Sequence, residues 1–178
     1  MLKAGKLLVA TPTIVDPNFA RTVVLLCQYG DEGAVGLVLN RPSDVAVADH
    51  LPEWTHLASD PLVGFGGPVD TDAAIGLGRG VVQSDLWTPI CCGLGLVDLS
   101  RSSTQIEGLE EVRVFAGYSG WGPGQLEREI AEAGWFVVDL DDQDVFSSDA
   151  TLLWSKVLRR QHGDLALFAD FPTDPSMN

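Results

Sequence analysis

The sequence predicts an α+β fold in one domain that spans residues 1–178. Apolar runs of strand length recur along the chain, and turns rich in glycine, proline, asparagine and aspartate separate them. Apolar residues recur at helical spacing in a few short stretches. A chain of 178 residues is about one domain long, and it can bury most of its apolar surface without disulfides or a metal.

In the first third of the chain, the clearest predicted element is a β-hairpin. Residues 21–28 and 34–39 are apolar runs on either side of residues 29–33, which have the composition of a turn. The second run is apolar throughout, which is typical of a strand buried on both faces. Three further elements are expected here: a strand at 6–11, a short helix at 45–51 and a strand at 61–65.

The rest of the chain predicts strands that alternate with helices. A strand at 111–116 precedes a helix that starts at Pro123 and ends at Gly134. The last helix, at 149–161, has Leu153 and Val157 on its apolar side. Further strands are expected at 73–78, 94–99, 135–138 and 165–168, with a short helix at 103–109 and a loop that carries Trp87, Pro89, Cys91 and Cys92.

Residues 117–127, with the sequence GYSGWGPGQLE, are the centre of the functional interpretation. They join the strand at 111–116 to the following helix, so we expect a glycine-rich turn. Backbone N–H groups and the positive end of the helix dipole would then converge on one concave spot, which suits an anion. The alternative is that the glycines only let the backbone turn sharply beneath Trp121, with nothing bound.

The spacing within this stretch excludes three motifs. A Walker A loop needs a lysine, and neither Lys nor Arg lies between Val114 and Glu127. A nucleophile elbow needs a glycine two places after its serine, but Trp121 stands two places after Ser119. The glycines at 120, 122 and 124 do not match the dinucleotide fingerprint.

Three segments at predicted strand ends are candidates for one ligand-binding cleft. Ligands often bind where strand ends gather at one edge of a sheet. Arg41 directly follows a core strand, and its guanidinium is a candidate ligand for an anion or carboxylate. An ion pair that only locks the fold is the alternative for this residue. The candidate ligand-binding residues are Asn40, Arg41, Gly66, Gly67, Pro68, Tyr118, Ser119, Gly120, Trp121, Gln125 and Glu127.

Two functions are compatible with this cleft. The first is a noncatalytic binding or regulatory protein that holds a small anion, a peptide or a protein partner, because no histidine lies near Ser119 in the sequence to activate it. The second is a hydrolase or transferase in which Ser119 or Tyr118 acts with Glu127 in acid–base chemistry. The second requires a carboxylate or imidazole within about 3 Å of the hydroxyl.

Charge and hydropathy exclude several classes of partner. The formal net charge is −14, from 25 acidic and 11 basic residues. Binding to a phosphate backbone needs clustered lysine and arginine, so direct binding of nucleic acid or of an anionic membrane is disfavoured. No apolar run approaches the roughly 18 residues of a membrane span, and the N-terminus has no signal-peptide pattern. We expect a cytoplasmic protein that is a monomer or a weak homo-oligomer.

Neither a metal nor a cofactor is expected. Cys27, Cys91 and Cys92 contain no C-x-x-C pair, and adjacent cysteines rarely close a disulfide because the ring is strained. The histidines have no zinc spacing. The acidic residues between 139 and 144 lack the glycine and the terminal glutamate of a calcium loop, which favours a solvated turn.

Five motifs stand in order along nearly the whole chain. They are LLVA at 7–10 with DPxF at 16–19, RTV at 21–23, GLVLNRP at 36–42, GGPV at 66–69 and GYSGWGPGQLE at 117–127. Together they closely resemble the YqgE/AlgH family of small bacterial proteins. The resemblance implies one compact α+β domain whose mixed sheet is curved into a flattened β-barrel, with helices packed outside. Some members are labelled transcriptional regulators, but the resemblance implies no particular reaction, cofactor or catalytic residue.

Overall fold

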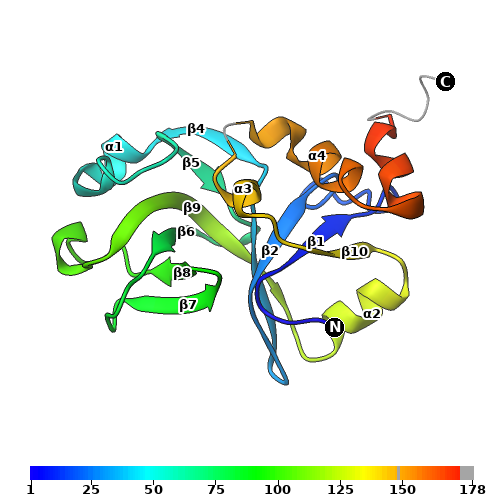
Figure 1. The fold of residues 1–178 in the computed structure, drawn as a ribbon, viewed down its shortest axis with the longest axis horizontal. Coiled ribbons are helices and arrows are strands. Elements are labelled where there is room, and N and C mark those ends of the chain that lie inside the picture. Colours follow the sequence, from blue (N-terminus) through cyan, green and yellow to red (C-terminus); the bar gives the residue numbers. More distant parts are fainter. Residues whose placement is uncertain (148, 173–178) are drawn as a thin grey trace.

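The apolar runs of the sequence form a ten-stranded sheet, drawn in Figure 1. The computed structural model describes residues 1–147 and 149–172. Eight strands follow the order β10-β1-β2-β3-β9-β6-β8-β7, and β5 joins β4 to β9. The strands are β1 (Lys6–Ala10), β2 (Val23–Gly30), β3 (Gly33–Val38), β4 (Pro42–Ala46), β5 (Leu62–Phe65), β6 (Val69–Gly80), β7 (Trp87–Cys91), β8 (Leu94–Val97), β9 (Leu109–Trp121) and β10 (Trp135–Asp139).

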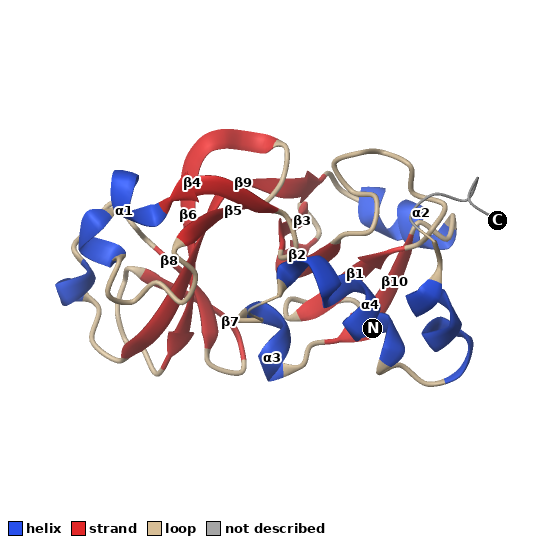
Figure 2. Cartoon of the chain, turned by 90° about the horizontal axis from the view of Figure 1, so that it is seen from above, coloured by secondary structure: helices blue, strands red, loops and turns tan. Residues whose placement is uncertain are grey.

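Short helices surround the sheet. Figures 1 and 2 show α1 at one end of the molecule, and α2 and α4 near the other. None of the helices that the structure describes has the length and apolarity to span a bilayer. The α-helices are α1 (Val47–His50), α2 (Gln125–Ala131), α3 (Asp142–Val145) and α4 (Leu153–Arg159), and the 3-10 helices are η1 (Pro52–Trp54), η2 (Ser103–Gln105), η3 (Ala150–Leu152) and η4 (Gly163–Asp170).

The sheet is mixed and open. Most neighbouring strands are antiparallel, but β5 runs parallel to β9, with Gly64 opposite Phe115. Within the described residues, β10 pairs only with β1 and β7 only with β8, so the two ends of the sheet do not meet. Pro89 suits β7 to an edge position, because proline has no backbone N–H to donate to a further strand. The α+β class is confirmed, but the predicted flattened barrel is wrong.

Helices α4 and α2 pack against opposite faces of β1. Successive side chains of a strand point to opposite faces of the sheet. Leu7 and Val9 share one buried cluster with the apolar side of α4, whereas Leu8 and Ala10 share another with Leu126 of α2. Both faces of the strand are therefore buried, which explains why residues 7–10 are apolar without alternation.

Several element predictions need correction. Strand β9 continues through Gly117 to Trp121, so most of the predicted glycine-rich turn is strand. The predicted loop around Pro89 contains β7, and an unpredicted strand, β4, precedes the short helix α1. The predicted strand at 165–168 lies in the 3-10 helix η4, because a short apolar run does not by itself distinguish strand from helix. The strands predicted at 6–11, 21–28, 34–39, 61–65, 73–78, 94–99, 111–116 and 135–138 are confirmed, with shifted boundaries.

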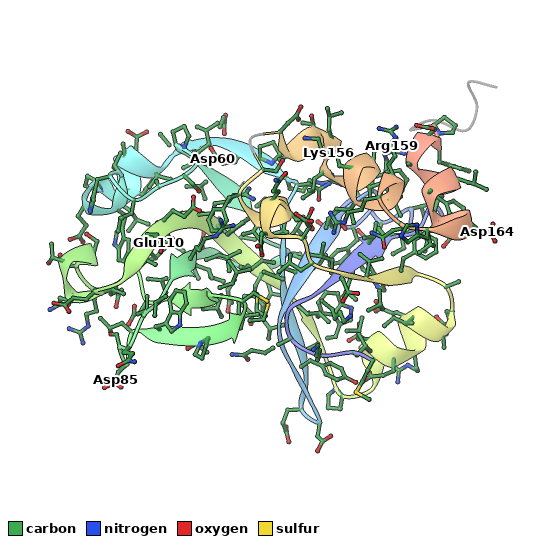
Figure 3. The ribbon with its side chains drawn as sticks, viewed as in Figure 1. Asp60, Asp85, Glu110, Lys156, Arg159 and Asp164 are labelled. Carbon is green, nitrogen blue, oxygen red and sulfur yellow. The ribbon has the colours of Figure 1, made fainter. Side chains whose placement is uncertain are left out.

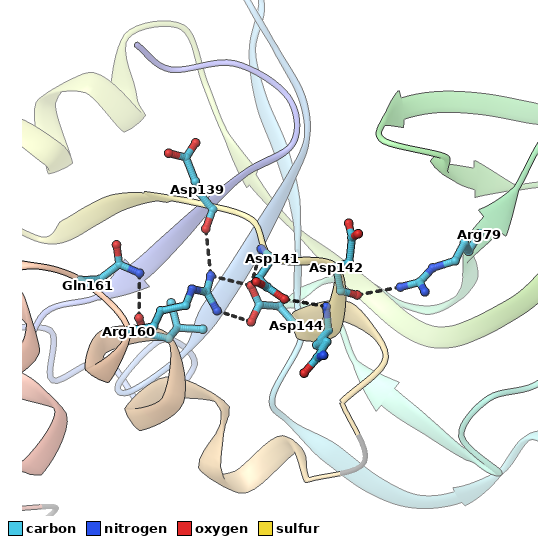
Figure 4. A network of polar contacts seen from close by, with 9 residues as sticks. Arg79, Asp139, Asp141, Asp142, Asp144, Arg160 and Gln161 are labelled. Carbon is cyan, nitrogen blue, oxygen red and sulfur yellow. Dashed lines mark hydrogen bonds and ion pairs between the residues drawn. The ribbon is translucent and has the colours of Figure 1, made fainter.

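Arginines tie the C-terminal segment to the sheet. Arg160 donates to both carboxylate oxygens of Asp144, which is 5% exposed as a side chain, and to the carbonyl of Asp139 at 2.8 Å (Figure 4). The buried Arg113 of β9 donates to two backbone carbonyls, one of them that of Val145 at 2.7 Å. The acidic turn at 139–144 thus supplies a helix cap and an ion pair.

Candidate functional site

The glycine-rich stretch at 117–121 is an interior strand of the sheet. Gly36 of β3 lies opposite Ser119, and Val69 of β6 lies opposite Tyr118. Strand pairing engages the backbone here, so its N–H groups do not converge on an open spot. Only residues 122–124 turn the chain, and α2 behind them has seven residues. Strand pairing of residues 117–121 therefore removes the support for an anion receptor there, and binding at residues 122–127 stays a prediction.

The second glycine motif packs directly across β9. The N–H of Gly66 donates to the carbonyl of Ala116 at 2.9 Å. A Cβ atom on Gly66 would lie 2.3 Å from the carbonyl oxygen of Gly117, and one on Gly67 would lie 2.3 Å from the carbonyl carbon of Tyr118. The two glycine motifs thus meet in space through close backbone contact. We call this contact, between 66–67 and 117–119, the glycine crossing.

The hydroxyl and carboxylate of the acid–base hypothesis do not meet. Ser119 is fully buried, and its hydroxyl donates to the carbonyl of Gly66 at 3.2 Å. No carboxylate or imidazole of the described residues is hydrogen-bonded to it. Glu127 instead accepts from the Tyr29 hydroxyl at 2.6 Å, and this bond lowers the pKa of Glu127. The other candidates of this group are half-buried or exposed: Tyr118, Pro68 and Gly120.

Trp121 and Gln125 fasten α2 to the sheet. Gln125 accepts from the N–H of Gly122 at 3.0 Å and donates to Glu129 at 2.9 Å. The other carboxylate oxygen of Glu129 accepts from the indoles of Trp121 at 2.9 Å and of Trp135 at 2.8 Å. The polar groups of Trp121 and Gln125 are thus hydrogen-bonded within the protein, and these bonds hold α2 against the sheet.

The backbone of Arg41 lies beside the second glycine motif, since its carbonyl accepts from the N–H of Phe65 at 2.7 Å. Asn40 and Arg41 nevertheless line a separate cleft of about 840 Å³, which we call the two-arginine cleft. This volume falls in the range of small-molecule binding sites, roughly 300–1,000 Å³. Its walls come from the loop after β1, the residues just before β2, the residues that follow β3, η3 with the N-terminal part of α4, and the segment after η4. The lining residues are Thr11, Pro12, Ile14, Val15, Ala20, Arg21, Asn40, Arg41, Pro42, Thr151, Leu152, Trp154, Ser155, Phe171 and Pro172.

The β2–β3 hairpin brings the two arginines to the same end of the sheet. Val24 lies opposite Val38 in the antiparallel register, so the residues before β2 lie beside those after β3. Asn40 fixes the corner, because its side chain accepts from the N–H of Val23 at 2.9 Å and donates to the carbonyl of Arg21 at 2.9 Å. Arg21 has a φ of 56°, a left-handed conformation that is uncommon outside glycine. Asn40 is thus a positioning residue for this arginine.

Each guanidinium is anchored by one hydrogen bond to the described residues. Arg21 donates to the carbonyl of Phe171 at 2.7 Å and lies 4.0 Å from the ring centroid of Trp154, whose indole donates to the carbonyl of Ala10 at 2.9 Å. Arg41 donates to the carbonyl of Ala20. A guanidinium has five N–H donors. Most donors of both arginines therefore remain available within the described structure.

The two-arginine cleft has an electrostatic character opposite to that of the whole chain. Among the residues that the structure describes, its lining contains no Asp or Glu, although the chain has 25 acidic residues. Acidic side chains such as Asp85 and Asp164 lie at the periphery of the molecule in Figure 3. Neither arginine forms an ion pair with a described carboxylate. Burial lowers the pKa of both guanidinium groups, because the charged form loses part of its hydration. Arginine nevertheless stays cationic at neutral pH.

Arg41 is a candidate site residue from the sequence alone, whereas Arg21 is not. Arg21 stands at the start of the apolar run at 21–28, and the predicted hairpin places that end of the run beside the residues that follow the strand at 34–39. The contribution of Trp154 and Ser155 had no local signal, because α4 reaches the cleft only through tertiary packing. No group of three or more His, Cys, Asp or Glu residues in the described part of the chain is arranged to hold a metal ion.

Comparisons with known proteins identify the family. The AlgH-like family model matches residues 7–166. A UPF0301 protein of Streptomyces coelicolor is 48% identical over 182 residues, which cover 98% of this chain and 94% of that protein. The crystal structure of a protein from Corynebacterium diphtheriae superposes with a TM-score of 0.89 at 30% identity, covering 96% of this chain and 93% of that chain. The solution structure of the AlgH protein from Pseudomonas aeruginosa gives 0.71 at 27% identity, with coverages of 96% and 95%. This chain therefore belongs to the AlgH-like family, in agreement with its sequence motifs.

Proposed function

We propose that this chain is a noncatalytic binding protein whose two-arginine cleft holds a small anion. The observation that carries the proposal is the pair of guanidinium groups, Arg21 and Arg41, which line one cleft without a described counter-ion in a chain of net charge −14. A partly desolvated cation gains stability when an anion pairs with it. Planar guanidinium groups match carboxylate and phosphate oxygens in bidentate fashion.

The lining of the cleft supports binding without catalysis. Its described lining residues include no His, Cys, Asp, Glu, Lys or Tyr, the side chains that commonly serve as a general base. Its hydroxyls belong to Thr11, Thr151 and Ser155. The alternative of a hydrolase or transferase that uses Ser119 or Tyr118 with Glu127 has less support, because the Ser119 hydroxyl is buried and bonded to backbone, and Glu127 accepts from Tyr29 and not from Tyr118.

A regulatory role is proposed to follow from ligand binding or from a protein partner, without direct contact to DNA. The negative field of the chain opposes a polyanion, whereas a small anion has to reach only one local positive site. We keep the expected cytoplasmic location and the monomeric or weakly oligomeric state as part of the proposal. A gel-shift experiment at low salt, where phosphate contacts are strongest, should show no complex with DNA.

Calorimetric titration tests the anion site directly. The purified chain is titrated with a panel of phosphates and carboxylates, alongside the variants Arg41→Gln and Arg128→Gln. Arg128 is an exposed arginine of α2, so its replacement makes the same change in net charge away from the cleft. Hydrogen bonds to charged groups contribute about 1.5–3 kcal/mol, so Arg41→Gln should weaken binding by about tenfold or more. Arg128→Gln should leave it unchanged.

The outcome is interpretable only when the fold is intact. Arg41 donates one hydrogen bond to the described protein, so its loss should change the thermal midpoint little. If no anion in the panel binds, or if Arg41→Gln and Arg128→Gln behave alike, the two-arginine cleft is not an anion site.

A further inference from the structure

Exposed apolar side chains gather at the two-arginine cleft. Val15 is 86% exposed, Leu152 is 51% exposed and Phe171 is 39% exposed, and all three line this cleft. Eight large apolar side chains of the described residues are exposed, and the other five do not line it: Met1, Val45, Leu62, Val81 and Leu167. Single exposed apolar residues are ordinary, but a group beside a concave site indicates a binding surface.

The apolar group and the arginines belong to the same cavity and not to neighbouring ones. Phe171 connects the two groups, because it is an apolar lining residue of the cleft and its carbonyl accepts from Arg21. Leu152 lies directly before α4, which also carries Trp154, the ring on which Arg21 stacks. A ligand that engages the arginines is therefore within reach of the apolar residues.

We infer that the ligand of the two-arginine cleft is an apolar carboxylate: its carboxylate pairs with Arg21 and Arg41, and its hydrocarbon or aromatic body covers Val15, Leu152 and Phe171. The inference rests on the proposed anion-binding function and names its ligand class. A carboxylate carries a single charge, so it meets less repulsion from a chain of net charge −14 than a multiply charged phosphate does. Its two oxygens also match a guanidinium fork.

A series of straight-chain acids separates the contribution of the hydrocarbon chain to binding affinity from that of the carboxylate. Acetate, butanoate, hexanoate and octanoate are titrated into the full chain by calorimetry, with inorganic phosphate and octanamide as controls. Affinity should rise about fourfold per methylene group, the factor for burial of one CH₂. Octanamide, which has the same body and no charge, should bind at least about tenfold more weakly than octanoate.

Matched substitutions locate the apolar contact. Leu152→Ser and Leu167→Ser make the same chemical change, but only Leu152 lines the cleft, and both side chains are more than half exposed, so neither should unfold the protein. Leu152→Ser should weaken octanoate binding by about tenfold and leave acetate binding unchanged. Leu167→Ser should change neither. Val15→Ser, at another exposed lining residue, provides a second variant with the same expected pattern.

The experiment also distinguishes a free acid from a peptide C-terminus as the source of the carboxylate. A tetrapeptide that ends in leucine is compared with its C-terminal amide. If the free peptide binds and its amide does not, a peptide C-terminus is included in the ligand class; if neither binds while octanoate does, the class is restricted to free acids. If anions bind in an Arg41-dependent manner but chain length and Leu152→Ser have no effect, this inference is wrong and the anion-binding function stands. If no anion binds, both fail.

Discussion

The glycine crossing and the two-arginine cleft differ in what fills them. At the crossing, backbone meets backbone so closely that a single added carbon on Gly67 would lie 2.3 Å from Tyr118. At the cleft, two cations face about 840 Å³ of open space, with one hydrogen bond each to the described residues. The more conspicuous sequence motif therefore belongs to packing, and the less conspicuous residues surround the cavity.

A glycine-rich motif can serve ligand binding or close packing of the backbone. Glycine allows the backbone to approach a ligand, and it equally allows one backbone segment to approach another. The partner of Gly66 and Gly67 is β9, whose own glycine at 117 has a φ of 69°. Variants at the crossing should therefore change stability, whereas variants at the cleft should change binding.

The largest expected effect is the loss of stability in Gly67→Ala. Its φ of 153° and the 2.3 Å contact with Tyr118 leave no room for Cβ, so unfolding should become easier by about 3 kcal/mol or more. Gly120→Ala is the matched control, because a Cβ there would lie 3.6 Å from the Tyr118 ring, in ordinary contact. Urea denaturation followed by circular dichroism measures both. Equal stability of the two variants would contradict the packing role of the crossing.

Asn40→Ala should affect both properties, because this residue connects the fold to the cleft. It removes the partners of the Val23 N–H and the Arg21 carbonyl, which should cost about 2 kcal/mol of stability. Anion affinity should fall as well, since Arg21 loses the group that fixes its left-handed backbone. Asn18→Ala, at an exposed site outside the cleft, is the control. Unchanged affinity in a folded Asn40→Ala variant would show that the corner does not position Arg21.

Arg41→Lys should have a smaller effect, confined to binding. The positive charge is retained but the planar fork is lost, so affinity for an anion should fall by about 1 kcal/mol, or roughly fivefold. Calorimetry of this variant beside Arg41→Gln separates charge from geometry. Identical affinities for wild type and Arg41→Lys would indicate that only the charge matters.

Tyr29→Phe should have the smallest effect, visible mainly in the pH dependence of stability. The hydrogen bond from Tyr29 lowers the pKa of Glu127 below its ordinary value of 4.5. This bond therefore stabilises the fold fully above pH 4.5, and the stabilisation is lost as pH falls through the lowered pKa of Glu127. The same bond raises the pKa of Tyr29 above 10.0, so the stabilisation is present below pH 10.0 and is lost as pH rises through the raised pKa of Tyr29. Thermal midpoints across this range should converge for wild type and variant at low pH. Tyr118→Phe serves as the control, and a constant difference at every pH would argue against the linkage.

Much of the fold follows from local pattern. The strands at 6–11, 21–28 and 34–39 are apolar because both faces are covered, and their pairing follows from the hairpin at 29–33. Strand β7 was not predicted, because it contains Pro89 and proline is typical of loops. An edge strand tolerates proline, since no neighbouring strand needs its backbone N–H. The open sheet could not be inferred, since closure depends on whether β10 and β7 meet, and nothing in either sequence determines that.

The site was only half predictable for a related reason. Arg41 has a local signal, a guanidinium placed directly after a core strand. Arg21 becomes a candidate only when the hairpin register is applied to the residues beyond both strand ends. Trp154 and Phe171 reach the cleft from segments more than 100 residues away, so tertiary packing alone places them there.

The most direct test of the two-arginine cleft is nuclear magnetic resonance of the arginine side chains during titration with octanoate and, separately, with phosphate. We expect the Nε–H signals of Arg21 and Arg41 to shift and saturate with at least one of these anions, while the Arg128 signal and the backbone amides of residues 117–121 stay in place. Shifts centred on residues 117–121, with the signals of Arg21 and Arg41 unmoved, would contradict this expectation.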